Sequence, residues 1–417
     1  MINPYKVIKE LDFERLAGTE GEKRAIEVIG THLKELGLEY KLEPFELVSF
    51  APGSAKLTID GKEFVGNPFG LNKDADISGE FLFLDNWEVV LYNKKAFEGK
   101  IIVSYGYSRK LATALMEQEA AAYIAIGTPA RKASSLSHRQ NSFEEGYVPS
   151  MTVDHITGEK LVKYSGKNAS VQIKQKVQKK TAHNIIVDIP GKGVDDNLTL
   201  SGAHYDSVAR CNGSSDNAGG TVTLLKVAEH FSKHQPDRDL RLIFFGAEEL
   251  GLLGSSAFVK AHKEELAKRV PFLLNIDVAG DPVGFDTAMV LGTKELLGYV
   301  DGISKEIGVA FKTYLGIYSS DGMPFSVQEI PSVSLSRRGG RANFYIHTSD
   351  DTPKLITNKA FDNTVKSAIN ILSRVLNAKI YPVKKEIDPY LRKDIERYVW
   401  NSTFAKPELD WEPEYKK

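Results

Sequence analysis

Acidic and imidazole side chains recur between residues 204 and 347 in a pattern that could bind metal ions. The set is His204, Asp206, Asp216, Glu248, Glu249, Asp277 and His347. Imidazole and carboxylate groups are the ligands that divalent metals such as zinc accept in proteins, and five of them can hold two ions when one carboxylate bridges the pair. The residue types therefore predict a hydrolytic metal site.

The elements that must position these side chains are strands of an open sheet. Apolar stretches typical of buried strands span residues 197–204, 240–245 and 272–276. The first ends on His204, the second leads to Glu248, and the third delivers Asp277. Asp216 lies in a loop rich in Gly and Ser, ahead of an amphipathic helix predicted over residues 221–231. Because ligands of open α/β sheets gather at the carboxyl ends of the strands, these side chains are expected to meet there.

Five sequence blocks around these residues resemble the signature blocks of metallopeptidase family 28, in clan MH. The blocks span residues 204–207, 215–220, 248–255, 275–277 and 347–352. They occur in the family's order, within a catalytic domain of about residues 180 to 376. The resemblance implies an α/β fold with a mixed, mostly parallel sheet flanked by helices, and a zinc-dependent exopeptidase activity.

The resemblance also implies a role for each ligand. Asp216 would bridge two zinc ions. His204 and Asp277 would complete one metal site, and Glu249 and His347 would complete the other.

Two further carboxylates match catalytic positions of the family: Glu248 its general base, and Asp206 the carboxylate that orients the first imidazole. The chemistry agrees, because a ligating His usually donates its second ring nitrogen to a carboxylate. Adjacent Glu248 and Glu249 point in different directions at a strand end, so one can bind metal while the other moves a proton.

The residues before His347 include candidates for contact with the substrate. Many relatives carry Ser-Asp-His ahead of a Pro-Phe pair, whereas residues 320–325 here have Gly in place of His. Residues 337–345 are basic and are expected to form a flexible loop at the rim of the cleft. The candidate substrate contacts are Arg337, Arg338, Arg341 and Tyr345. A guanidinium could bind a substrate carboxylate through two hydrogen bonds, and the alternative is a solvated loop with ordinary packing of Tyr345.

Length and pattern divide the 417 residues into several parts. Residues 1–50 begin the catalytic domain, residues 51–178 form a β-rich insertion that resembles a protease-associated domain, residues 179–379 complete the catalytic domain, and residues 380–417 form an extension. Because the insertion contains no metal ligand, the catalytic domain is expected to keep its zinc without it.

The extension contains the aromatic residues Tyr390, Tyr398, Trp400, Phe404, Trp411 and Tyr415, which pack either on the parent domain or on a second subunit of a homo-oligomer.

Composition and net charge bear on which classes of partner the protein binds and where it is located. A formal net charge of −1 gives no global electrostatic argument for nucleic-acid or anionic-membrane binding. No apolar run reaches membrane-spanning length and the amino terminus lacks the apolar core of a secretory signal, so a cytoplasmic location is expected. The single cysteine, Cys211, fits a reducing compartment and is expected to be a small buried residue.

These observations predict a di-zinc exopeptidase that removes amino-terminal residues from peptides, using a water activated by the metals and Glu248 as general base. The alternatives are a glutamate-type metallocarboxypeptidase, a glutaminyl cyclase with a single zinc, and a receptor-like binding module without catalysis. The cyclase conflicts with a full set of five ligands, and the receptor-like module is expected to have lost ligands.

Overall fold

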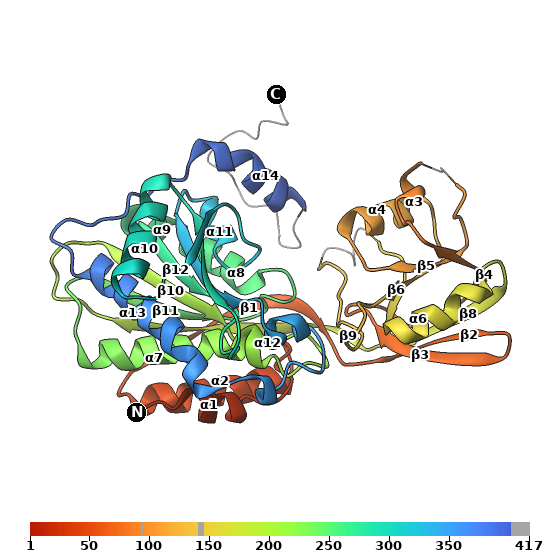
Figure 1. The fold of residues 1–417 in the computed structure, drawn as a ribbon, viewed down its shortest axis with the longest axis horizontal. Coiled ribbons are helices and arrows are strands. Elements are labelled where there is room, and N and C mark those ends of the chain that lie inside the picture. Colours follow the sequence, from red (N-terminus) through yellow and green to blue (C-terminus); the bar gives the residue numbers. More distant parts are fainter. Residues whose placement is uncertain (93–94, 141–145, 402–417) are drawn as a thin grey trace.

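The computed structural model describes residues 1–92, 95–140 and 146–401 (Figure 1). Within these residues the chain forms an α/β part around an eight-stranded sheet and, beside it, a closed barrel of seven strands. The barrel is formed from residues between strands β1 and β9 of the sheet. The two bodies therefore meet where the chain leaves the sheet and returns to it.

The large sheet is mixed. Its strand order is β1-β9-β11-β10-β12-β15-β13-β14. The strands are β1 (Lys41–Phe50), β9 (Val177–Ile189), β10 (Leu198–His204), β11 (Asp239–Phe245), β12 (Phe272–Ile276), β13 (Phe285–Leu291), β14 (Lys312–Leu315) and β15 (Ser332–Arg338). Four neighbouring pairs are parallel, including β10 with both β11 and β12, and three are antiparallel. The expected mixed α/β sheet is confirmed, but parallel pairs exceed antiparallel ones by only one.

Helices cover both faces of this sheet (Figure 1). One face packs against α1 (Pro4–Glu10), α2 (Glu20–Glu35), α7 (Gly219–Lys233), α10 (Lys294–Glu306) and α13 (Asp362–Leu376). The other packs against α8 (Leu253–Ala261), α9 (Lys263–Arg269), α11 (Met323–Ser326) and α14 (Arg392–Asn401). The central strands are apolar on both sides for this reason: on β11, Phe244 and Phe245 are both fully buried but belong to different core clusters.

The barrel forms from short strands, as the sequence indicated for this region. Its strands are β2 (Ser54–Ile59), β3 (Lys62–Pro68), β4 (Ala75–Leu84), β5 (Ile101–Tyr105), β6 (Ala122–Ile126), β7 (Ser150–Val153) and β8 (Asn168–Lys174). Its helices are α3 (Val89–Tyr92), α4 (Arg109–Glu117) and α6 (His155–Leu161). The resemblance to a protease-associated domain and the exact domain boundaries stay predictions.

The carboxyl-terminal extension packs on the parent domain as far as the structure describes it. Its buried residues Ile387, Leu391, Ile395 and Val399 join the core cluster that contains Phe245, Phe258 and Phe325. Phe404, Trp411, Tyr415 and the side chain of Trp400 lie outside the described residues. A homo-oligomer stays a prediction.

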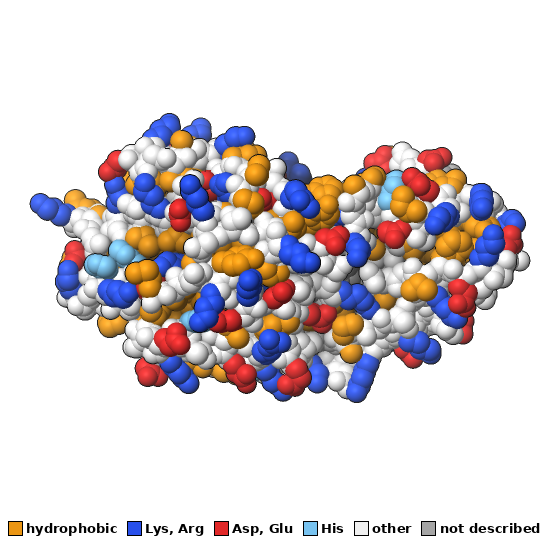
Figure 2. All heavy atoms as spheres, turned by 60° about the horizontal axis from the view of Figure 1, so that its bottom comes forward, with side chains coloured by type: hydrophobic (Ala, Val, Ile, Leu, Met, Phe, Trp, Pro, Cys, Tyr) orange, Lys and Arg blue, Asp and Glu red, His pale blue; other side chains and the backbone are white. Residues whose placement is uncertain are grey.

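The described surface carries charges of both signs. Figure 2 shows Lys and Arg side chains interspersed with Asp and Glu across the face that it presents. No helix among the described residues has the length and apolar character needed to cross a membrane.

Candidate metal centre

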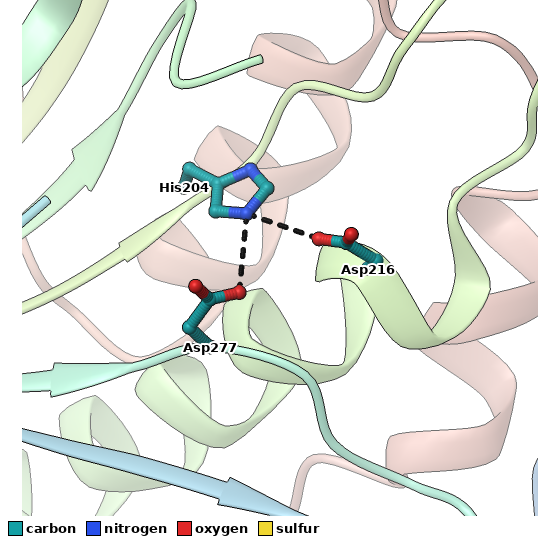
Figure 3. A group of neighbouring side chains, drawn as sticks. All are labelled: His204, Asp216 and Asp277. Atoms are coloured by element: carbon teal, nitrogen blue, oxygen red, sulfur yellow. Dashed lines mark ion pairs between the residues drawn. The ribbon is translucent and has the colours of Figure 1, made fainter. Parts of the chain in front are cut away.

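A first group of three buried donors forms at the carboxyl ends of two adjacent parallel strands (Figure 3). His204 is the last residue of β10, and Asp277 directly follows β12. Asp216 lies in the short helical turn η2 (Ser214–Ala218) that leads into α7, where a loop was expected. The Nε2 atom of His204 lies 3.2 Å from Oδ1 of Asp216 and 3.4 Å from Oδ1 of Asp277. The three donor atoms all lie within 4.8 Å of one another, which is close enough for them to share one cation.

A second group of donors contains the other carboxylate oxygen of Asp216, together with Glu249 and His347. The Nε2 atom of His347 lies 3.1 Å from Oδ2 of Asp216 and 3.2 Å from Oε2 of Glu249. Asp216 therefore faces one imidazole with each of its oxygens, which is the geometry that a bridging ligand requires. Glu249 follows β11 by four residues, and Glu248 beside it belongs to neither group of donors in the described part of the chain.

Asp206 connects the first imidazole to the two glutamates. Its fully buried carboxylate accepts hydrogen bonds from the backbone N–H groups of Glu248 (3.1 Å) and Glu249 (3.2 Å). Its Oδ1 atom also lies 3.4 Å from Nδ1 of His204. One carboxylate thus orients the end of β10 relative to the turn after β11, so a change at Asp206 is expected to disturb both groups of donors.

The centre gathers far more negative than positive charge. Burial by itself would lower the pKa of His204, but the neighbouring carboxylates, Glu248 foremost, raise it well above its ordinary value. The pKa of His347 is raised in the same way, against burial, by Glu249 and Asp216. An imidazole is held protonated in such surroundings when no other cation is present, and bound cations would relieve the same repulsion.

Glu248 has the environment of a proton acceptor. Burial raises its pKa well above the ordinary value, against the attraction of His204, and the carboxylates of Glu249 and Asp321 add to the rise. A carboxylate that is destabilised in this way binds a proton readily. Cations in the two groups of donors would lower its pKa toward the working range.

Sequence reasoning missed a carboxylate that supports the backbone at Asp216. Asp351 is fully buried, and its two oxygens accept hydrogen bonds from the backbone N–H groups of Ser215 (2.9 Å) and Asp216 (3.1 Å). Burial raises the pKa of Asp351 to about 7, and the charge of Asp216 contributes to the rise. Its position in the block at 347–352 was a signal that could have identified it.

Arg15, also missed, supports the loop between the first imidazole and Asp216. Its buried guanidinium donates to the backbone carbonyls of Tyr205 (2.7 Å) and Gly213 (2.8 Å). Because Arg15 lies 190 residues from Tyr205, no local pattern could have indicated this contact. The same loop contains Cys211, which is buried as expected.

The basic stretch before His347 is not a flexible loop, and this expectation was wrong. Arg337 and Arg338 end strand β15, which pairs with β12 and β13, and residues Arg341 to Tyr345 form the short helix α12. At its end the strand pairs with β13 alone, and the N–H of Arg337 donates to the carbonyl of Val278 at 2.9 Å. These hydrogen bonds satisfy the backbone, so the charge of the last side chains does not prevent the strand from forming.

The four candidate substrate contacts differ in their surroundings. Arg337 pairs with Asp286 (3.0 Å) and donates to a backbone carbonyl, so its guanidinium is engaged within the fold. Arg338 lies over the ring of Tyr318 at 4.7 Å. Burial raises the pKa of Tyr318, and the charge of Asp277 adds to the rise, which indicates that this ring lies near the first group of donors. Arg341 lies 6.0 Å from the ring of Tyr345 and is exposed.

Comparison with known proteins agrees with this geometry. Residues 184–372, which contain both groups of donors together with Asp206 and Glu248, match the model of peptidase family M28. The match covers less than half of the chain, and within it the residues resemble peptidase family M28. Together with the relatives described below, this match identifies the protein as a metallopeptidase.

Relatives in this family are named as aminopeptidases. Aminopeptidase YwaD of Bacillus subtilis is 25% identical over 411 residues, which cover 90% of this chain and 82% of that protein. Leucine aminopeptidase 2 of Arthroderma otae is 25% identical over 278 residues, which cover 64% of this chain and 55% of that protein. The chain thus spans about half the length of the fungal protein.

Solved structures share the whole fold. The zinc aminopeptidase BSAP from Bacillus subtilis matches with a TM-score of 0.74 at 21% identity, covering 93% of this chain and 98% of that one. A peptidase M28 precursor from Shewanella amazonensis SB2B matches with a TM-score of 0.75 at 22% identity, covering 93% and 95%. These spans are too long for the catalytic part alone, so most of the overall architecture is shared.

Proposed function

We propose that the protein is an aminopeptidase that holds two zinc ions, with Asp216 as the bridging ligand. The observation that carries the proposal is that the two oxygens of Asp216 face two different imidazoles, at 3.2 Å and 3.1 Å. One zinc would be held with His204 and Asp277, and the other with Glu249 and His347. Imidazole and carboxylate donors suit zinc, so the residues present fit the metal.

In the proposed mechanism the metals and the two adjacent glutamates have different chemical roles. When bound, the zinc ions would supply Lewis acidity to the scissile carbonyl and lower the pKa of water toward neutrality. Glu248 would accept the proton of the attacking water and return it to the leaving amine. This assignment is supported because Glu249 lies in the second group of donors and Glu248 in neither.

The charge of the centre supports recognition of a free amino group. Five carboxyl groups, those of Asp206, Asp216, Glu248, Glu249 and Asp277, surround two imidazoles. Two divalent zinc ions would offset four of these five negative charges, and the negative charge that remains would attract a substrate ammonium and repel a substrate carboxylate. The names of the relatives agree with this direction of cleavage.

A metallocarboxypeptidase is the second candidate, because Arg338 lies over Tyr318 beside the centre and could bind a terminal carboxylate. Two groups of donors weigh against a cyclase with a single zinc, and the presence of every donor weighs against a receptor-like module.

The direction of cleavage can be tested with blocked peptides. An aminopeptidase should lose turnover when the amino terminus of the peptide is acetylated and keep it when the carboxyl terminus is amidated. The opposite pattern would assign the protein as a carboxypeptidase, and Arg338→Ala should then raise KM for the free acid. Zinc content is measured on the same preparation, and about one zinc per chain at full activity would contradict the bridged pair.

A further inference from the structure

A segment of the barrel reaches the catalytic part beside a proposed metal ligand. This segment, residues 128–140, follows β6 and is called the bridging segment below. Nη2 of Arg131 donates to the backbone carbonyl of Ile346 at 2.6 Å, and the backbone N–H of Ser135 donates to the backbone carbonyl of His347 at 2.8 Å. Two consecutive backbone carbonyls beside the second group of donors therefore accept hydrogen bonds from residues of the barrel.

His347 needs such support more than the other ligands. Its φ angle is 60°, in the left-handed region, which residues with a side chain adopt uncommonly and at a cost in free energy. Its side chain is also 39% exposed, compared with 1% for His204, so packing contributes less to its position. On the amino-terminal side, Asp281 accepts the backbone N–H of Ala342 (2.7 Å), which fixes the start of α12 but not the residues beyond its end.

The bridging segment forms hydrogen bonds both with the barrel and with the large sheet. Its Leu136 carbonyl and His138 N–H pair with the backbone of Gly70 in the barrel, at 2.7 Å and 2.9 Å. The side-chain amide of Gln140 pairs with both the N–H and the carbonyl of Val48 on β1, at 2.7 Å and 2.9 Å. The donors that reach Ile346 and His347 are therefore fixed relative to the sheet that carries the other ligands.

We infer that Arg131 and Ser135 are positioning residues for the second zinc site, and that the barrel is a structural part of the metal centre. This inference rests on the proposed pair of zinc ions. It predicts a selective effect, because His204 and Asp277 stand at the ends of central strands, whereas His347 lies in a turn after α12 whose carbonyl groups accept hydrogen bonds from the bridging segment. The expectation that the catalytic domain keeps its zinc without the insertion is revised accordingly: the second zinc should be lost first.

The test compares Arg131→Ala with Lys132→Ala in the full chain. Lys132 is exposed and lies in the same segment, so it controls for local disturbance. Zinc affinity is measured by competition with a chelator, and thermal unfolding is recorded for every variant. One of the two zinc ions should bind roughly 10- to 100-fold more weakly in Arg131→Ala, the range for loss of a group that orients a ligand. The other zinc and the Lys132→Ala variant should be unchanged. Arg131→Lys keeps the positive charge but not the planar guanidinium group, and should show a smaller loss of zinc affinity at the same site.

Combination with ligand variants identifies the site affected. After Glu249→Ala has removed the second site, Arg131→Ala should not weaken the remaining zinc further. After Asp277→Ala it should still weaken zinc at the site that holds His347. Equal weakening of both ions, or unchanged affinity for both in folded Arg131→Ala and Arg131→Lys, would overturn the inference and leave the proposed function standing. A wild-type chain that binds no zinc would instead refute the proposed function and the inference with it.

Discussion

Replacing Asp206 with Asn tests whether one buried carboxylate holds the metal centre together. The substitution preserves shape but turns one acceptor oxygen into an NH₂ donor. One oxygen accepts from Glu249, and the other accepts from Glu248 and lies 3.4 Å from Nδ1 of His204. Whichever way the amide is oriented, its NH₂ group faces at least one N–H donor, and that hydrogen bond is lost.

The size of the effect follows from the bond that is lost. A hydrogen bond to a charged group contributes about 1.5–3 kcal/mol, which corresponds to roughly 10- to 100-fold in an equilibrium constant. The same range is typical when a carboxylate behind a metal-binding imidazole is removed. Asp206→Asn should therefore weaken zinc binding by roughly 10- to 100-fold and lower turnover at limiting zinc, with partial recovery as zinc is raised.

The assay is a zinc titration against a chelator of known affinity, with turnover measured across the same range of free zinc. Asp196→Asn is the matched control, because Asp196 is exposed in the turn before β10, at the opposite end of the strand that carries His204. If Asp206→Asn binds zinc as tightly as Asp196→Asn and keeps full turnover, the argument that Asp206 orients the ligands is refuted.

Three further predictions concern the same centre. Glu248→Gln should keep its zinc and lose turnover by roughly 10²- to 10⁴-fold, whereas Glu249→Ala should lose zinc affinity; zinc content and turnover measured together would reveal reversed roles. Asp351→Ala should lower the free energy of unfolding by at least about 2 kcal/mol in denaturant titrations, because it leaves two buried N–H groups without an acceptor, and an unchanged midpoint would contradict this. Zinc affinity should fall as pH falls through the pKa values of His204 and His347, by roughly tenfold per pH unit for each imidazole that must lose a proton. Because both pKa values are raised in the metal-free protein, this loss should begin at a higher pH than for an ordinary imidazole, and pH-independent affinity would contradict the assignment of both as ligands.

The local sequence pattern was sufficient to predict the two strands that carry His204 and Asp277. The strand expected to end on His204 is β10, and the stretch expected to deliver Asp277 is β12. A run of apolar residues that ends in a polar side chain reports the end of a buried strand, because burial on both faces leaves no room for polar groups before that point. The same reasoning failed at Arg337 and Arg338, where charge suggested a loop but pairing with β13 extends strand β15 instead.

The sequence by itself determined which side chains could bind metal and that His204 and Asp277 stand at strand ends, since both follow from residue type and short-range periodicity. Only the tertiary structure decided how they combine. It turned the two oxygens of Asp216 toward different imidazoles, and it brought Arg131 to Ile346 across 215 residues. Such contacts join backbone groups to side chains that are distant along the chain, and the sequence near either partner carries no pattern that pairs them. The candidate ligands are therefore predictable from local chemistry, whereas the groups that hold them in place depend on how the sheet, its loops and the barrel pack together.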